Sequence, residues 1–163
     1  MRRVTFIALS FVIFLLEASF LPVFCGGVWQ VDLWLILIGV SALVLERRCP
    51  ILFSIIGGIS QDLITGNFFG LHLISYLAVA LLLTAFIKEK YNRHWYVSVA
   101  TVTIGTLLSS LISALVLYAG YKVFPGFTYA LSITAPMILL NAAGAVIFHN
   151  LLWSIRYEGE PRW

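Results

Sequence analysis

Two carboxylates stand inside long apolar segments of this chain, and they are the side chains there most able to do chemistry. Glu17 lies in the first apolar segment, and Asp62 lies in the stretch GGISQDLITGNFFG. Buried charge in apolar surroundings is costly, so such residues usually face the interior of a helical bundle. Both are expected toward the same end of the bundle, where they could share one pocket. Glu17 could instead be protonated, or extend toward a surface, with a hydroxyl partner.

Small residues surround Asp62 at a regular spacing, because Gly58, Asp62, Gly66 and Gly70 follow one another at intervals of four. Four residues turn an α-helix by about 400°, so each member lies about 40° from the last. The result is a drifting stripe of small residues, which lets a neighbouring backbone approach closely. Two interpretations stay open. Asp62 is a cap that orders a tight turn permitted by Gly66 and Gly70, or it belongs to a polar pocket or partner contact.

A second series of small residues repeats at four-residue spacing further along the chain. Its members are Thr101, Gly105, Ser109 and Ser113. This small-xxx-small pattern is typical of a helix-packing seam. Asn141, near the middle of the last apolar segment, is expected to serve in packing; the alternative is an interhelical hydrogen bond, worth about 1 kcal/mol or less.

The histidines offer little support for catalysis or metal binding. His72, His94 and His149 have no spacing that resembles a metal site. His72 could pair with Asp62, but no motif places a nucleophile beside them, and the common hydrolase, metalloprotease and phosphate-binding motifs do not occur. The sequence therefore predicts no metal, no cofactor and no enzymatic activity.

The elements that must position these residues are long and apolar. Of the 163 residues, 61% are hydrophobic and only 10% are charged, against about 25% charged in a soluble domain. The ten basic residues are too few and too scattered for a nucleic-acid-binding face. We therefore expect an all-α membrane protein forming one domain over residues 1–163. Its six predicted transmembrane segments lie at about 4–21, 28–45, 51–64, 71–87, 96–118 and 129–153.

The distribution of basic residues predicts the orientation of these segments. With six spans and an inner N-terminus, nine of the ten basic residues lie on the inner side and only Lys122 lies outside. Cytoplasmic loops carry such an excess of Lys and Arg. The third segment covers only about 21 Å, so it must extend into TGNFFG, thin the bilayer locally, or form a re-entrant hairpin with the second segment. That hairpin would move Arg47 and Arg48 outside, so six spans with both termini inside are preferred.

The order of features around Asp62 also matches a known pattern. GISQDLITGNFFG follows G-x-x-x-D-x-x-x-G-x-x-x-G, after VDLWLILIGVSALVLERRCP and before an apolar segment with Tyr76 and the basic loop KEKYNRHWY. These features resemble the MreD family of rod shape-determining inner-membrane proteins. Chain length, six spans and short loops agree with that resemblance over the whole chain. It implies a fold similar to the substrate-binding components of energy-coupling-factor vitamin transporters.

The resemblance implies a non-enzymatic scaffold of the cell-elongation machinery in the bacterial inner membrane. The implied partners are an MreC-like bitopic protein, the MreB filament system, RodA and a class B penicillin-binding protein. We expect a seam of small residues to dock the transmembrane helix of the MreC-like partner. The alternative is a vitamin-like small-molecule-binding subunit of a transporter, whose outer pocket would be lined by Glu17, Asp62, Asn67 and His72.

Overall fold

The computed structural model of the chain describes residues 3–20, 30–66, 69–87, 94–122 and 127–157. The regular structure of these residues is entirely helical, which confirms the predicted all-α class. A π-helical turn, η1, continues the first helix. The elements are α1 (Arg3–Leu15), η1 (Leu16–Phe20), α3 (Leu33–Val44), α4 (Arg48–Thr65), α5 (Leu71–Phe86), α6 (Trp95–Tyr121) and α7 (Phe127–Tyr157).

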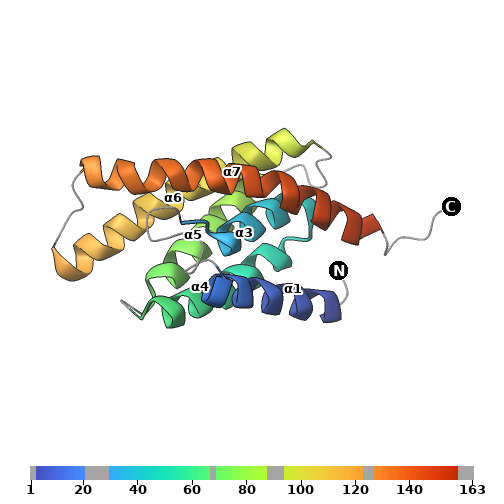
Figure 1. Cartoon of the computed structure of the whole chain (residues 1–163), viewed down its shortest axis with the longest axis horizontal. Helices are drawn as coiled ribbons and strands as arrows, with labels where there is room; N and C mark the ends of the chain where they lie inside the picture. The colour runs from blue at the N-terminus through green and yellow to red at the C-terminus, as the bar shows by residue number, and fades with distance from the viewer. Residues whose placement is uncertain (1–2, 21–29, 67–68, 88–93, 123–126, 158–163) are drawn as a thin grey trace.

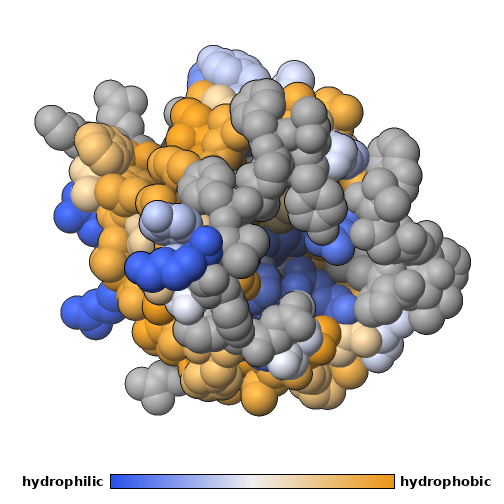
Figure 2. All heavy atoms as spheres, turned by 90° about the vertical axis from the view of Figure 1, so that its left-hand side faces the viewer, coloured by the Kyte–Doolittle hydropathy of each residue, from blue (hydrophilic) through white to orange (hydrophobic). Residues whose placement is uncertain are grey.

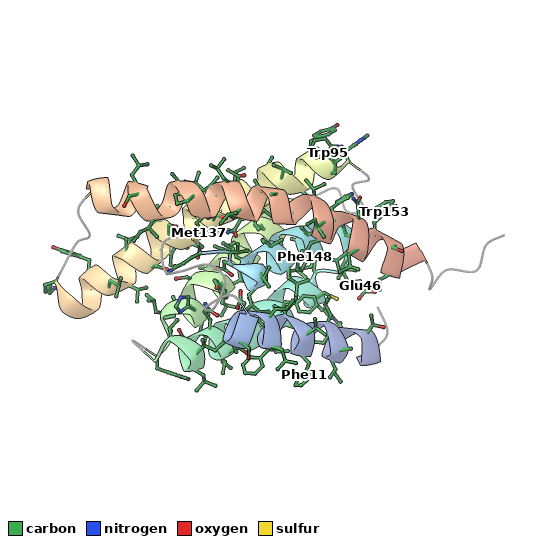
Figure 3. All side chains as sticks on the ribbon, in the orientation of Figure 1. Phe11, Glu46, Trp95, Met137, Phe148 and Trp153 are labelled. Carbon is green, nitrogen blue, oxygen red and sulfur yellow. The ribbon has the colours of Figure 1, made fainter. Side chains whose placement is uncertain are left out.

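Successive helices run in opposite directions along the bundle (Figure 1). The amino end of α1 and the carboxyl end of α7 therefore lie at the same end, where Glu46, Trp95 and Trp153 are also found (Figure 3). The opposite end holds η1, the amino ends of α3 and α5, and the carboxyl end of α4. We call it the distal end.

Helix α3 is the centre of the bundle. Every residue from Trp34 to Leu45 is buried, and the helix packs against α4, α5, α6 and α7. Its sequence, apolar all round, is typical of a helix enclosed on every side. With 12 residues, α3 is about 18 Å long, and it begins well inward of the distal ends of α6 and α7 (Figure 1).

Two helices begin at different residues from those expected. Helix α4 starts at Arg48 rather than near 51, because Pro50 falls in its first turn, where the missing amide donor costs nothing. Its 18 residues give about 27 Å instead of the expected 21 Å. Helix α3 starts at Leu33, after a capping aspartate, rather than near 28. Residues 28 and 29, where the second predicted span begins, lie outside the described residues.

Within the described residues, two helices are long and apolar enough to cross a membrane by length and composition. They cover Trp95–Gly120 in α6 and Leu131–Ile155 in α7, whereas the other apolar helices, Thr5–Ser19, Leu33–Val44 and Leu71–Phe86, are shorter. Only 28% and 11% of the two long stretches are buried inside the protein. A core helix of a soluble protein would be mostly buried, so these exposed apolar faces support a membrane protein.

Candidate functional site: two capped helix starts at the distal end

The amino end of α3 lies inside the protein, where its free amides need acceptors. The Glu17 carboxylate provides one, since Oε1 accepts hydrogen bonds from the amides of Leu33 at 2.7 Å and Trp34 at 3.3 Å. Asp32 is the N-cap, and its Oδ1 accepts from the amide of Leu35 at 2.8 Å. Two acidic side chains therefore meet at one helix start, where the positive end of the helix dipole favours them.

Glu17 reaches this position from the π-helical turn that ends the first helix. The turn runs from Leu16 to Phe20, and within it Glu17 is buried while Leu16 is exposed. A π-helical turn of this kind re-aims side chains relative to a regular helix and is frequent at functional sites. The turn thus directs one carboxylate into the bundle from a helix that is otherwise apolar.

Asp32 also connects α3 to three other helices. Its Oδ2 accepts a hydrogen bond from the Tyr76 hydroxyl at 2.6 Å, and its amide donates to Asn141 Oδ1 at 3.0 Å. The Asn141 side-chain amide donates in turn to Thr106 Oγ1 at 3.1 Å. All four residues are buried. The network gives Asn141 interhelical hydrogen bonds where packing was the expected role, and it fixes α3 to α5, α6 and α7 in one polar layer.

Asp62 caps the other helix start at this end. Its Oδ2 accepts from the amides of Gly70 at 2.8 Å and Leu73 at 3.3 Å. Its Oδ1 accepts from the amide of His72 at 2.9 Å and lies 3.0 Å from His72 Nδ1. Both oxygens are thus bonded across the corner between α4 and α5. This geometry confirms the interpretation of Asp62 as a cap that orders the corner.

The glycines around Asp62 have separate tasks in that corner. At Gly58 a Cβ would lie 2.5 Å from the Leu73 Cα, so glycine is what permits α4 and α5 to pack this closely. Gly66 ends α4 with a φ of 62°, and Gly70 precedes α5 with a φ of 102°. These left-handed conformations suit glycine. The four residues at this spacing therefore have three roles. Gly58 permits close packing, Asp62 is the cap, and Gly66 and Gly70 are turn positions.

The second seam of small residues is also used within the bundle. Thr101 and Ser109 are buried, and Gly105 faces side chains of α5. Ser113 Oγ lies 2.9 Å from Ser75 Oγ on α5. The chain's own helices thus fill this seam and the contact at Gly58, which leaves no open surface there for the partner helix expected from the sequence.

Glu17 and Asp62 do not form one site by direct contact. Each carboxylate caps a different helix, although Tyr76 lies within electrostatic reach of both. His72 joins the two regions more directly, because its ring lies 5.8 Å from the Tyr76 ring in an edge-on arrangement. Asn67, the fourth residue expected to line a pocket, lies outside the described residues.

One oxygen of Glu17 remains unused by the cap. Glu17 Oε2 is buried and has no hydrogen-bond partner among the described residues. The ion pair at this end joins His72 to Asp62, and no basic side chain of the described residues forms one with Glu17. Seen from the distal end, hydrophilic surface lies near the centre of the bundle, with apolar surface toward the rim (Figure 2). The amino end of α3 therefore keeps a buried polar atom without a partner.

The chemistry of these groups is binding and capping. His149 and His94 lie apart from Asp62 and His72: His149 Nδ1 is 2.7 Å from Ser98 Oγ, and His94 stacks on Tyr96. In the described ranges no three His, Cys, Asp or Glu residues lie close enough together to hold a metal ion.

The sequence analysis missed Asp32, Tyr76 and Thr106 as parts of this site. Asp32 did have a signal, because an aspartate directly before the apolar run LWLILIG is a preferred N-cap. Tyr76 and Thr106 have no comparable local signal, since their roles depend on which helices become neighbours.

Comparisons with models of known protein families, with curated proteins and with solved structures found no match to this chain.

Proposed function

We propose that the chain is a rod shape-determining, non-enzymatic scaffold of the bacterial cell-elongation machinery. It is embedded in the inner membrane and docks an MreC-like bitopic protein during lateral wall synthesis. The support is the MreD-like stretch itself, because Gly58 and Asp62 hold α4 against α5, while Gly66 and Gly70 form the turn between them. Residues devoted to the shape of the bundle favour a scaffold over an enzyme.

The proposed topology has six spans with both termini inside. It is supported by the alternating directions of the helices, which bring the beginning of α1 and the end of α7 to one end (Figure 1). Single cysteines at exposed Glu46 and Lys122 test it in a chain whose own cysteines are replaced by serine. An impermeant maleimide should label position 122 in intact cells and position 46 only after permeabilisation. Labelling of both positions in intact cells would contradict six spans.

The docking surface is expected on the outward apolar faces, since the seams of small residues are filled. A photo-crosslinking residue placed on one helix at a time identifies the face. Suitable exposed positions are Phe11 on α1, Leu63 on α4, Phe86 on α5, Leu111 on α6 and Leu139 on α7.

The scaffold proposal predicts crosslinks from one helix, or two adjacent helices, to a bitopic protein with a periplasmic domain. Val40, which is fully buried in α3, is the matched position that should give none. Recovery of no bitopic protein from any of the five exposed positions would contradict the proposal.

A small-molecule-binding subunit of a transporter is the second candidate. The observation in its favour is the hydrophilic centre of the distal end, with an unpartnered carboxylate oxygen at the amino end of α3 (Figure 2). Purification of the tagged chain from native membranes, followed by mass spectrometry of proteins and small molecules, separates the two. A transporter ATPase pair with a retained metabolite supports transport, and a bitopic protein in near-equal amount supports the scaffold.

A further inference from the structure

The carboxylate oxygen that caps nothing is the feature of the distal end that scaffolding leaves unexplained. The Glu17 side chain is 5% exposed, and Oε2 lacks a hydrogen-bond partner among the described residues. Because Oε1 is held by the amides of Leu33 and Trp34, Oε2 must lie beside the amino end of α3. A buried polar atom of this kind calls for a partner from outside the chain.

The charges at this helix start indicate what that partner carries. Glu17 and Asp32 bring two carboxylates together, whereas a helix dipole supplies only about half a positive charge. No Lys or Arg side chain forms an ion pair with either carboxylate in the part of the chain that the structure describes. An anion is disfavoured there, because the amides of Leu33, Trp34 and Leu35 are already occupied.

The site lies toward the distal end of the bundle. Helix α3 begins inward of the distal ends of α6 and α7 (Figure 1). The view onto the distal end shows hydrophilic surface near the centre and apolar surface toward the rim (Figure 2). Polar surface therefore faces the distal side.

We infer that the amino end of α3 binds a cationic nitrogen group, a primary ammonium or a guanidinium. Its N–H donates to Glu17 Oε2, and its charge offsets those of Glu17 and Asp32. The group belongs to a soluble amine or to the ammonium headgroup of a phospholipid. The site is inferred from the geometry of Glu17, Asp32 and α3. The inference does not depend on the docking of a partner protein.

Thermal unfolding of the full chain in nanodiscs tests the inference. The starting lipid is phosphatidylcholine, whose quaternary ammonium has no N–H to donate. Agmatine, which carries both an ammonium and a guanidinium, should raise the unfolding temperature in a concentration-dependent manner. Tetramethylammonium at equal ionic strength should not, because it has the charge without the donor. Equal shifts with the two ions would reduce the effect to screening and overturn the inference.

A second experiment, carried out without soluble amine, identifies the source of the nitrogen group. Stabilisation in phosphatidylethanolamine nanodiscs relative to phosphatidylcholine, lost in Glu17→Gln, identifies a lipid headgroup. Stabilisation by agmatine alone identifies a soluble amine. Stabilisation in neither arm would leave water as the occupant of the site and overturn the inference.

The matched variants are Glu17→Gln and Glu46→Gln. Glu17→Gln keeps an oxygen that can accept from the α3 amides, but it replaces the unpartnered Oε2 with an amide nitrogen. Agmatine should therefore bind at least about tenfold more weakly to this variant. The second removes an exposed carboxylate at the opposite end and should leave binding unchanged (Figure 3). Unchanged affinity in Glu17→Gln would contradict the assignment. The two-ion comparison uses wild-type protein, so it decides the question even if Glu17→Gln does not fold.

Discussion

Two helices begin at the distal end, and each is capped by a carboxylate from the preceding helical segment. At α5, Asp62 uses both oxygens and has His72 beside it. At α3, Glu17 uses one oxygen, and the other is buried without a partner in the described residues. The two caps therefore differ in whether a carboxylate oxygen is left without a hydrogen-bond partner. A saturated cap holds structure, whereas an unsaturated one keeps binding capacity at a stability cost.

The largest effect is expected at the saturated cap. Asp62→Leu removes the acceptor for the amides of Gly70, His72 and Leu73. At roughly 1 kcal/mol or more for each amide left without a partner, it should destabilise the fold by about 3 kcal/mol or more. Folded yield, measured by size-exclusion chromatography in detergent, should fall sharply. Wild-type yield with loss of the proposed scaffold function would instead give Asp62 a direct functional role.

A smaller loss is expected from the packing contact beside that cap. In Gly58→Ala the new Cβ would lie 2.5 Å from the Leu73 Cα, so α4 and α5 must separate. Overpacking of this kind costs about 1–3 kcal/mol, which thermal unfolding would detect. The comparison variant is Gly66→Ala, where the Cβ meets nothing within 4 Å and the φ of 62° is the source of strain. Such strain costs about 1–2 kcal/mol.

The two glycine variants also differ in where their effect appears. Gly58→Ala should weaken the Asp62 cap, because it displaces the amide of Leu73, while Gly66→Ala should loosen the end of α4 alone. Hydrogen exchange at the amides of α5 distinguishes them. Equal protection of these amides in both variants would show that the cap does not depend on the close packing of α4 against α5.

Tyr76→Phe tests the hydrogen-bond network that joins Asp32 of α3 to the neighbouring helices. It removes the hydroxyl that donates to Asp32 Oδ2 at 2.6 Å, so a second carboxylate at this helix start loses a partner. The expected loss is about 1.5 kcal/mol, read from thermal unfolding. Tyr96→Phe, at an exposed tyrosine, is the matched control and should change little. An equal effect of both would mean that the Asp32 contact contributes no stability.

The two caps were not equally predictable from the sequence. The corner at Asp62 depends on residues close in the chain, with turn-forming glycines at regular spacing, so local pattern was enough to predict it. The cap by Glu17 joins residues 16 positions apart through a π-helical turn, and no local pattern specifies either. The network from Asp32 to Asn141 spans 109 positions and depends on the helix arrangement.

The helix boundaries show the same division between local and tertiary signals. The apolar segments predicted the helices, because enclosed or membrane-facing helices need long apolar runs. Helix α4 starts before the apolar run that predicted it, because its first turn contains Arg48 and Pro50, and a first-turn proline is tolerated. The seams at Gly58 and Gly105 were correctly recognised as close-packing surfaces, but spacing alone cannot show whether the neighbour is the chain's own helix or a partner.

The most direct test of the contrast between the two caps is the unfolding temperature of Glu17→Gln against that of Asp62→Asn, in one detergent. Asp62→Asn turns one of two fully used oxygens into a donor facing amides, so it should cost about 2 kcal/mol. Glu17→Gln keeps an acceptor for the α3 amides and alters the unpartnered oxygen, so stability should change by less than about 0.5 kcal/mol or rise. Equal losses in the two variants would contradict the account, because both caps would then be purely structural.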